Sequence, residues 1–231
     1  MRGHTSHDLY RAKLIHRRLT LAVVTAAVAL APAACAYKGL SMAAQTAATL
    51  HGDAALEAPA RTPSVGTASA TTTRAETYNP ALAPQGAHMS ATLTPSGEST
   101  NAEFTVSGLQ PNRSYAAQAH VNTCGGVPEG VGPIYQNRID PAVNTTAVGV
   151  AESSDPQYAN PQNEVWLDVR TDASGSGTSR ATVPFVFTDR GPGSIVVTDA
   201  EQTSAGKGGT PVACLTLSAV QPKGVEPRGS R

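Results

Sequence analysis

The chain has 231 residues, with 17 basic and 17 acidic side chains and no formal net charge at pH 7. This balance gives no broad basic surface of the kind that binds nucleic acid, so we expect no nucleic-acid partner. The 21 glycines and 17 prolines make the chain rich in turns, and only 4% of its residues are aromatic. The three cysteines are an odd number, which predicts a separate fate for one of them.

The N-terminal segment has the pattern of an export signal. Five basic residues precede an apolar run from Leu19 to Leu30: Arg2, Arg11, Lys13, Arg17 and Arg18. The run is shorter than the roughly 20 helical residues that span a bilayer. Small residues follow it, as at a signal-peptide cleavage site. Export would place the mature chain in an oxidising compartment, where a disulfide persists.

Two cleavage sites fit the small residues that follow the apolar run. Ala33-Ala34-Cys35 is similar to a bacterial lipobox, although Pro32 stands where Leu or Val is usual. Cleavage there would make Cys35 the lipidated first residue, anchoring the protein to the outer face of the cell membrane or in the cell envelope. Ala34-Cys35-Ala36 instead fits ordinary signal peptidase, which would give a secreted protein; an uncleaved anchor is a third alternative. We favour lipidation at Cys35 within a signal region of residues 1–36.

Residues 37–86 are rich in Ala, Thr, Ser and Pro. Such a composition buries too little apolar surface to offset the loss of chain entropy on folding. We therefore expect this stretch to be a disordered stalk between the membrane and a folded domain.

Residues 87–219 have the pattern of an all-β domain. Short runs of alternating polar and apolar residues, separated by Gly/Pro turns, predict a sandwich or barrel without a substantial helix. The expected strands are His88–Thr94, Ala102–Ser107, Tyr115–Asn122, Asn163–Val169, Thr178–Phe187, Ser194–Ala200 and Val212–Ser218. Residues 220–231 are predicted to be a disordered tail.

A long Gly/Pro-rich excursion, residues 125–161, interrupts these strands and has no periodicity. It is too long for a simple connection, so it is functional, disordered, or what is left of a functional loop. Cys124 and Cys214 flank most of the domain. They either pair or remain as two buried free thiols.

Five stretches together resemble copper-zinc superoxide dismutase in its exported actinobacterial form. They are Gln118-Ala-His120 with Cys124-Gly125, Gly132-Pro-Ile-Tyr-Gln136, Asn160-Pro-Gln-Asn-Glu-Val-Trp-Leu-Asp168, Ser194-Ile-Val-Val-Thr-Asp-Ala-Glu201 and Pro211-Val-Ala-Cys214. The resemblance implies an eight-stranded Greek-key barrel over residues 87–219 and a Cys124–Cys214 disulfide. Because related barrels often pair, it also makes a homodimer possible.

The metal ligands of that family are largely missing here. Its first copper pair is a His-x-His on one strand, and the first of these positions is Gln118. The histidine of its Gly-Pro-His is replaced by Ile134, which cannot ligate a metal. The remaining family positions fall on Thr198 or Asp199 for the late copper histidine, on Val165 rather than Asp168 for the zinc aspartate, and on Pro211 for the arginine that attracts superoxide.

A histidine count leads to the same conclusion. His4, His7 and His16 lie in the signal region and His51 in the expected stalk, which leaves only His88 and His120 in the domain. A copper-zinc pair of this family takes about six imidazoles, so we expect neither copper nor zinc as a cofactor. His120, with Gln118 and Asp199, could hold one divalent ion weakly; the alternative is that His120 is a hydrogen-bonded remnant.

Three functions remain open, and we assign no catalytic residue. The favoured one is a non-catalytic scaffold or binding module of the cell envelope, whose protein partner cannot be identified from the sequence. The alternatives are a divergent superoxide dismutase, or an envelope protein that binds a single metal or acts as a chaperone. No Gly-x-Ser-x-Gly turn and no phosphate-binding loop supports another enzyme class. The Ala205–Gly209 segment, with Lys207, is expected to be a surface turn.

Overall fold

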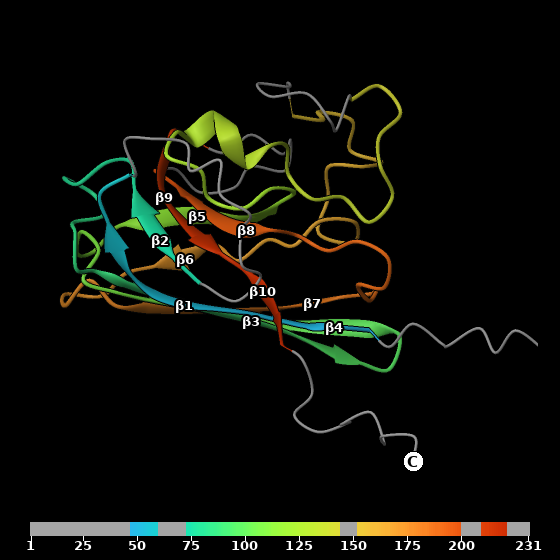
Figure 1. The fold of residues 1–231 in the computed structure, drawn as a ribbon, viewed down its shortest axis with the longest axis horizontal. Coiled ribbons are helices and arrows are strands. Elements are labelled where there is room, and N and C mark those ends of the chain that lie inside the picture. The colour runs from blue at the N-terminus through green and yellow to red at the C-terminus, as the bar shows by residue number, and fades with distance from the viewer. Residues whose placement is uncertain (1–46, 60–72, 144–151, 200–208, 221–231) are drawn as a thin grey trace, which may run out of the picture. The chain divides into compact units, whose positions relative to one another are not determined.

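A computed structural model describes residues 47–59, 73–143, 152–199 and 209–220 (Figure 1). The signal region, Cys35 and residues 205–208 of the expected Ala205–Gly209 turn lie outside the described residues. Within the described part of the chain, no helix is long and apolar enough to cross a membrane.

The described residues form ten strands and one short 3-10 helix. In chain order these are β1 (Thr49–Glu57), β2 (Ala75–Thr77), β3 (His88–Ser96), β4 (Ser99–Ser107), β5 (Ser114–His120), η1 (Pro128–Val131), β6 (Val169–Arg170), β7 (Gly177–Val183), β8 (Ser194–Thr198), β9 (Pro211–Thr216) and β10 (Ser218–Val220).

The strands make one sheet that closes almost completely on itself. Their order is β6-β5-β8-β9-β2-β1-β3-β4-β7, with β10 paired to β1. The end strands β6 and β7 lie against each other, which brings the two edges of the sheet together. All pairs are antiparallel except β1 with β2. The predicted all-β Greek-key barrel is confirmed.

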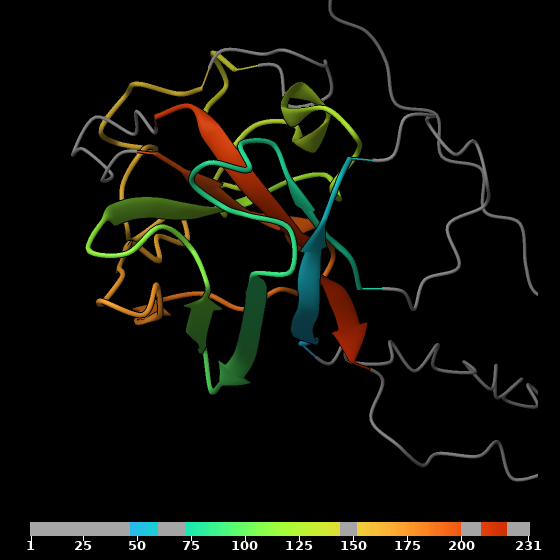
Figure 2. The same ribbon diagram turned by 90° about the vertical axis from the view of Figure 1, so that its left-hand side faces the viewer.

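The barrel has two sides that pack face to face. β1, β3, β4 and β7 make one layer, and β5, β6, β8 and β9 lie across from it (Figures 1 and 2). Every second residue of β3 and β4 points into the space between the layers, as the period of a strand requires. Phe104 and Val106, expected on one face, are both buried in this core.

The β3–β4 hairpin shows how local sequence sets the register. Ser96 pairs with Ser99, so Gly97 and Glu98 make a two-residue turn. Gly97 has φ +64°, a left-handed conformation that glycine adopts without steric cost. Buried residues alternate with more exposed ones along β3 and β4, and this register places the core residues of both strands on the same side of the sheet.

The implied disulfide is present. Cys124 and Cys214 are bonded, with their Cα atoms 5.8 Å apart and a sequence separation of 90. The bond ties the segment after β5 to β9 in the barrel wall, so the alternative of two free thiols is wrong.

The expected disordered stalk is wrong at two places. Residues 49–57 and 75–77, within 37–86, are strands β1 and β2 of the barrel. β1 has a weak pattern, but it pairs with β3 over six residues and buries Leu50 and Leu56. Long-range pairing therefore outweighs its poor local signal. Residues 37–46 and 60–72 lie outside the described part.

Several strand boundaries also differ from the expectation. Of the predicted 163–169 strand, only Val169 lies in a strand, β6, which continues to Arg170. β7 ends at Val183 because Pro184 has no N–H to donate to a neighbouring strand. The expected tail begins one residue too early, since Val220 pairs with Thr49 in β10.

We predict that Gly52→Ala destabilises the protein by about 1–3 kcal/mol. A Cβ at Gly52 would lie 2.5 Å from the carbonyl oxygen of Thr216, so β1 and β9 would have to separate. Denaturant unfolding would measure the loss. Ala55→Val, which adds bulk at an exposed position of the same strand, is the control. If both variants matched the wild type, β1 would not be packed in the barrel.

Breaking the disulfide should lower the melting temperature by many degrees. Freeing a 90-residue loop gives the unfolded chain more entropy, worth roughly 4 kcal/mol as an upper figure. Thermal unfolding with and without a reductant, alongside a Cys124→Ser/Cys214→Ser variant, would test this. The same melting curve in all three samples would contradict a stabilising role for the bond.

Candidate functional site

Strand β5 is buried on both faces, and its outer face carries the candidate site. Tyr115, Ala117 and Ala119 belong to the barrel core. Alternate side chains of a strand point in opposite directions, so Gln118 and His120 point away from that core. They are nevertheless only 2% and 8% exposed, because the chain after β5 covers them.

Two later segments of the chain lie against β5: the long excursion, at Ile134, and the residues just after it, at Trp166. Trp166 lies opposite Gln118, and Ile134 lies opposite His120. Backbone hydrogen bonds flank each pair, from Leu167 to Ala117 and from Tyr135 to Ala119 among others. The described parts of the excursion are therefore ordered by the free edge of β5. This outcome fits a functional loop, or what is left of one, better than a disordered connection.

His120 is held as a neutral imidazole. Its Nδ1 lies 2.8 Å from the carbonyl oxygen of Gly132. Burial lowers the pKa of His120 to about 4, although the Gly132 hydrogen bond raises it in part. A neutral ring carries one N–H, and a carbonyl can only accept, so Nδ1 carries the hydrogen. Nε2 is then left with a free electron pair.

Gln118 adds an unusual polar group to the same face. Its side chain is almost fully buried, and its Nε2 makes no hydrogen bond within the described residues. A buried amide without a partner costs about 1–3 kcal/mol. This position is thus not optimised for stability.

Two carboxyl groups that the sequence analysis did not single out lie beside this face. Glu164 is 1% exposed and accepts hydrogen bonds from Gln136 Nε2, at 2.8 Å, and from Trp166 Nε1, at 2.7 Å. Burial raises the pKa of Glu164, and both hydrogen bonds act against that rise.

Glu152 is the second carboxyl group. Its Oε2 accepts a hydrogen bond from the backbone N–H of Ile134, at 2.9 Å. Burial raises the pKa of Glu152 to about 7; the Ile134 hydrogen bond opposes this shift, and repulsion from Glu164 adds to it. Neither acid stands out in the sequence, because Glu152 lies in a stretch without periodicity. For Glu164, the nearby Trp166 was the one feature of the sequence that indicated burial.

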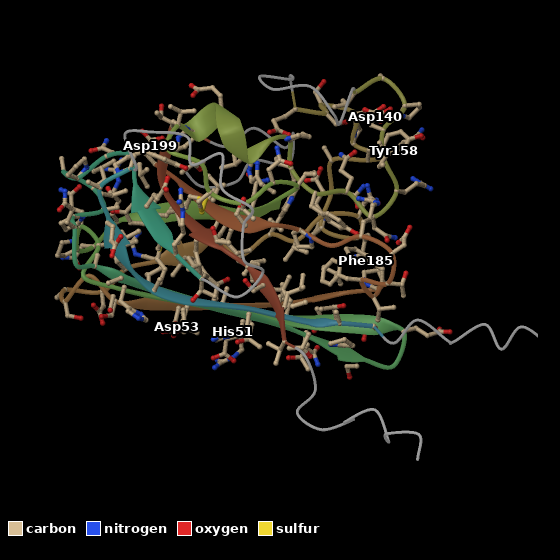
Figure 3. The ribbon with its side chains drawn as sticks, in the orientation of Figure 1. His51, Asp53, Asp140, Tyr158, Phe185 and Asp199 are labelled. Carbon is tan, nitrogen blue, oxygen red and sulfur yellow. A yellow bond between two sulfur atoms is a disulfide. The ribbon has the colours of Figure 1, made fainter. Side chains whose placement is uncertain are left out.

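Asp199 does not join His120. Its Oδ1 accepts from the Thr210 backbone N–H at 2.7 Å. His120 pairs with Ser194 at one end of β8, and Asp199 follows the other end. The two are therefore on the order of 15 Å apart along the strand. Figure 3 shows Asp199 at the end of the molecule away from Asp140.

The other family positions are occupied by residues with structural roles. Val165 is buried in the barrel core, and Asp168, three residues later in the sequence, is exposed. Thr198 ends β8 and Pro211 begins β9, where the two are paired.

The histidines of the barrel are dispersed. His51 lies in β1, so placing it in a stalk was wrong, and the barrel contains three histidines among its described residues: His51, His88 and His120. His51 bonds to Thr92 and His88 to Asp53, on the exposed side of the β1–β3 layer. β8, β9 and β2 separate that layer from β5 in the sheet. The lower position of His51 and Asp53 is clear in Figure 3.

The copper and zinc that the resemblance implies do not fit these residues. Copper that cycles between two oxidation states in such a site needs several nitrogen ligands. The outer face of β5 offers one imidazole, with Gln118 and Ile134 in the neighbouring places. Among the residues described, no group of three or more His, Cys, Asp or Glu side chains could hold a metal ion.

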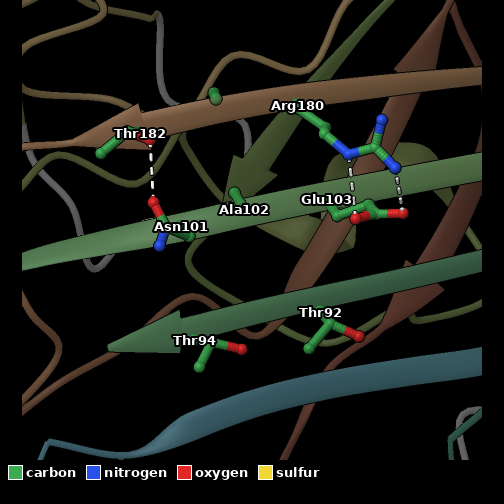
Figure 4. A pocket seen from close by; sticks show the side chains of 8 residues that line it. Thr92, Thr94, Asn101, Ala102, Glu103, Arg180 and Thr182 are labelled. Atoms are coloured by element: carbon green, nitrogen blue, oxygen red, sulfur yellow. Dashed lines mark hydrogen bonds and ion pairs between the residues drawn. The ribbon is translucent and has the colours of Figure 1, made fainter. Parts of the chain in front are cut away.

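A shallow hollow lies on the opposite side of the barrel, over β3, β4 and β7 (Figure 4). Its polar groups are engaged with one another. Arg180 donates two hydrogen bonds to Glu103, at 2.9 and 3.1 Å, and Thr182 donates to Asn101 at 2.9 Å. Exposed pairs of this kind contribute little energy, and we assign this surface no ligand.

Comparison with models of known protein families gives no match for this chain, and comparison with individually curated proteins gives none. The candidate site therefore rests on its own geometry.

We predict that the free energy of unfolding falls as the pH drops from about 6.5 to about 4 because of His120. The unfolded imidazole takes up a proton near 6.5, whereas the folded one resists until about 4. The slope attributable to one such group is at most about 1.4 kcal/mol per pH unit. Urea unfolding across this range should show a smaller acid loss in His120→Asn than in the wild type. Equal slopes would show that His120 is not buried as a neutral ring.

Proposed function

We propose that this protein is an exported, lipid-anchored β-barrel that resembles copper-zinc superoxide dismutase but acts as a scaffold or binding module of the cell envelope. Cys35 would carry the lipid. The barrel would present its surfaces outside the membrane and would not dismutate superoxide.

The dispersal of the imidazoles is the observation that carries this proposal. Among the three histidines in the described residues, only His120 lies on the outer face of β5, while His51 and His88 are on the far layer. Two positions beside β5 carry apolar side chains. Ile134, in Gly132-Pro-Ile134, lies opposite His120, and Val196, on β8, lies opposite Gln118. A redox-active copper site needs nitrogen donors in those directions.

The disulfide and the ordered excursion support a structural role. Cys124, Val131, Val196 and Cys214 form an apolar cluster that holds the start of the excursion on the barrel wall. A stable, oxidised barrel with an ordered surface loop suits a binding module in an oxidising compartment.

One observation favours a second candidate, an envelope protein that binds a single metal. A metal-ligating histidine usually donates its other ring N–H to a carbonyl or carboxylate, which fixes the tautomer. His120 has that arrangement with Gly132, which leaves Nε2 as a possible donor. Nothing comparable favours catalysis.

Metal content and superoxide consumption together test the proposal. The full chain would be expressed with its N-terminal segment, in medium supplemented with copper and zinc, and then purified. We expect substoichiometric copper and zinc, and superoxide decay no faster than in buffer. His120→Ala should change neither result, and His88→Ala is the control for adventitious binding on the exposed layer.

Stoichiometric copper with rapid dismutation that is lost in His120→Ala would overturn the proposal. One divalent ion per chain without dismutation, lost in His120→Ala but kept in His88→Ala, would establish the second candidate instead.

A further inference from the structure

We propose that Glu152 is a proton-operated latch, which holds the surface segment of residues 152–166 (the strap) over the outer face of β5 when protonated and releases it when ionised. The proposal does not depend on the partner or metal content of the barrel.

The strap is fastened to residues 134–140, which run beside it, mostly by uncharged contacts. Asn137 N–H donates to the Asn163 carbonyl, and the Asn163 side chain bonds to both the N–H and the carbonyl of Arg138. Arg138 also donates to the Gln157 carbonyl and lies 5.1 Å from the centre of the Tyr158 ring.

Glu152 fastens the beginning of the strap differently. The backbone N–H of Ile134 points away from β5, and Glu152 Oε2 accepts its hydrogen bond as the carbonyl oxygen of a neighbouring strand would. Ile134 in turn faces His120 on β5. Release of Glu152 would therefore loosen the strap where it covers the β5 face.

Among the residues that the structure describes, the groups that act on Glu152 carry no counter-charge. On the strap itself, Glu164 is the charged group that acts on it, by repulsion. From β5 the neutral His120 and Gln118 face this side, and from residues 134–140 come the Ile134 N–H and the Gln136 amide. Asp140, a further acid, bonds to the adjoining Ser153. Arg138 is directed to Gln157 and Tyr158 instead, and Arg190 donates to the carbonyl oxygens of Gln136 and Asn137.

The buried Glu164 and the half-buried Glu152 receive hydrogen bonds from neutral donors and repel each other, so the two carboxyl groups cannot both ionise without cost. Glu164 has two side-chain donors, whereas Glu152 has one backbone donor. Glu152 is thus the group that stays protonated longer. Its pKa of about 7 in the closed strap, against an ordinary 4.5, agrees with this assignment.

The sign of the pH effect follows from that difference. Below about pH 4.5 the carboxyl is protonated whether the strap is closed or open, so closure is fully favoured. Between about 4.5 and 7 the open form loses its proton while the closed form keeps it. The equilibrium constant for opening should then rise roughly tenfold per pH unit, and level off above 7.

Hydrogen exchange at the Ile134 amide tests the latch. Its protection factor, already corrected for the intrinsic dependence of exchange on pH, should fall roughly tenfold per pH unit between pH 5 and 7. Ala91, in the centre of the β3–β4 ladder, serves as the internal control. Trp166, the single tryptophan, gives an independent fluorescence signal for the same opening.

Glu152→Gln keeps an acceptor oxygen and cannot ionise, so its Ile134 protection should not depend on pH in this range. Glu98→Gln, in the exposed β3–β4 turn, should behave as the wild type. Glu164→Gln removes the repulsion that helps to raise the pKa of Glu152. The pH at which the fall in Ile134 protection levels off should therefore be lower in this variant. If Ile134 protection in the wild type is independent of pH, or if Glu152→Gln keeps the wild-type slope, the latch is wrong.

Discussion

The absence of a solvent-facing side on β5 is the constraint on which the site depends. One set of its alternate side chains fills the barrel core, and the other set is covered by the chain that follows. Because the excursion must pair with the edge of β5 to cover it, polar groups from distant parts of the sequence are brought into one buried layer. The disulfide fixes where that excursion begins.

This buried layer contains ionisable groups whose effects on stability oppose each other. His120 stabilises the folded state more as the pH rises from about 4 to 6.5, since the folded ring stays neutral. Glu152 has the opposite effect between about 4.5 and 7, since the folded carboxyl keeps its proton. Their contributions partly cancel in the range where both titrate. In the pH dependence of the free energy of unfolding of the whole protein, the contributions of His120 and Glu152 would therefore overlap, and variants are needed to separate them.

The sequence predicted much of the barrel but little of its covered face. The period of two in 102–107 and 115–122 was enough to place Phe104, Val106 and the β5 side chains, because alternation survives wherever one face is buried. Alternation did not predict β1, because its small residues indicate a packed strand only when the contact of Gly52 with β9 is known. It also failed for Glu152 and Glu164, since their burial comes from tertiary pairing of a segment with no local pattern. Asp199 was expected near His120 because the resemblance places a metal-ligand position at Thr198 or Asp199, but the antiparallel register of β5 and β8 places Asp199 and His120 at opposite ends of the pair.

Within the described residues, the outer face of β5 presents one imidazole, that of His120, whereas a redox-active copper needs several nitrogen ligands. We therefore expect that this face does not bind copper. Crystals of the purified protein grown with Cu²⁺, with anomalous scattering recorded at the copper edge, would address it directly. The account predicts no anomalous peak at Nε2 of His120. A fully occupied copper ion bonded to that nitrogen, with further protein ligands around it, would contradict it.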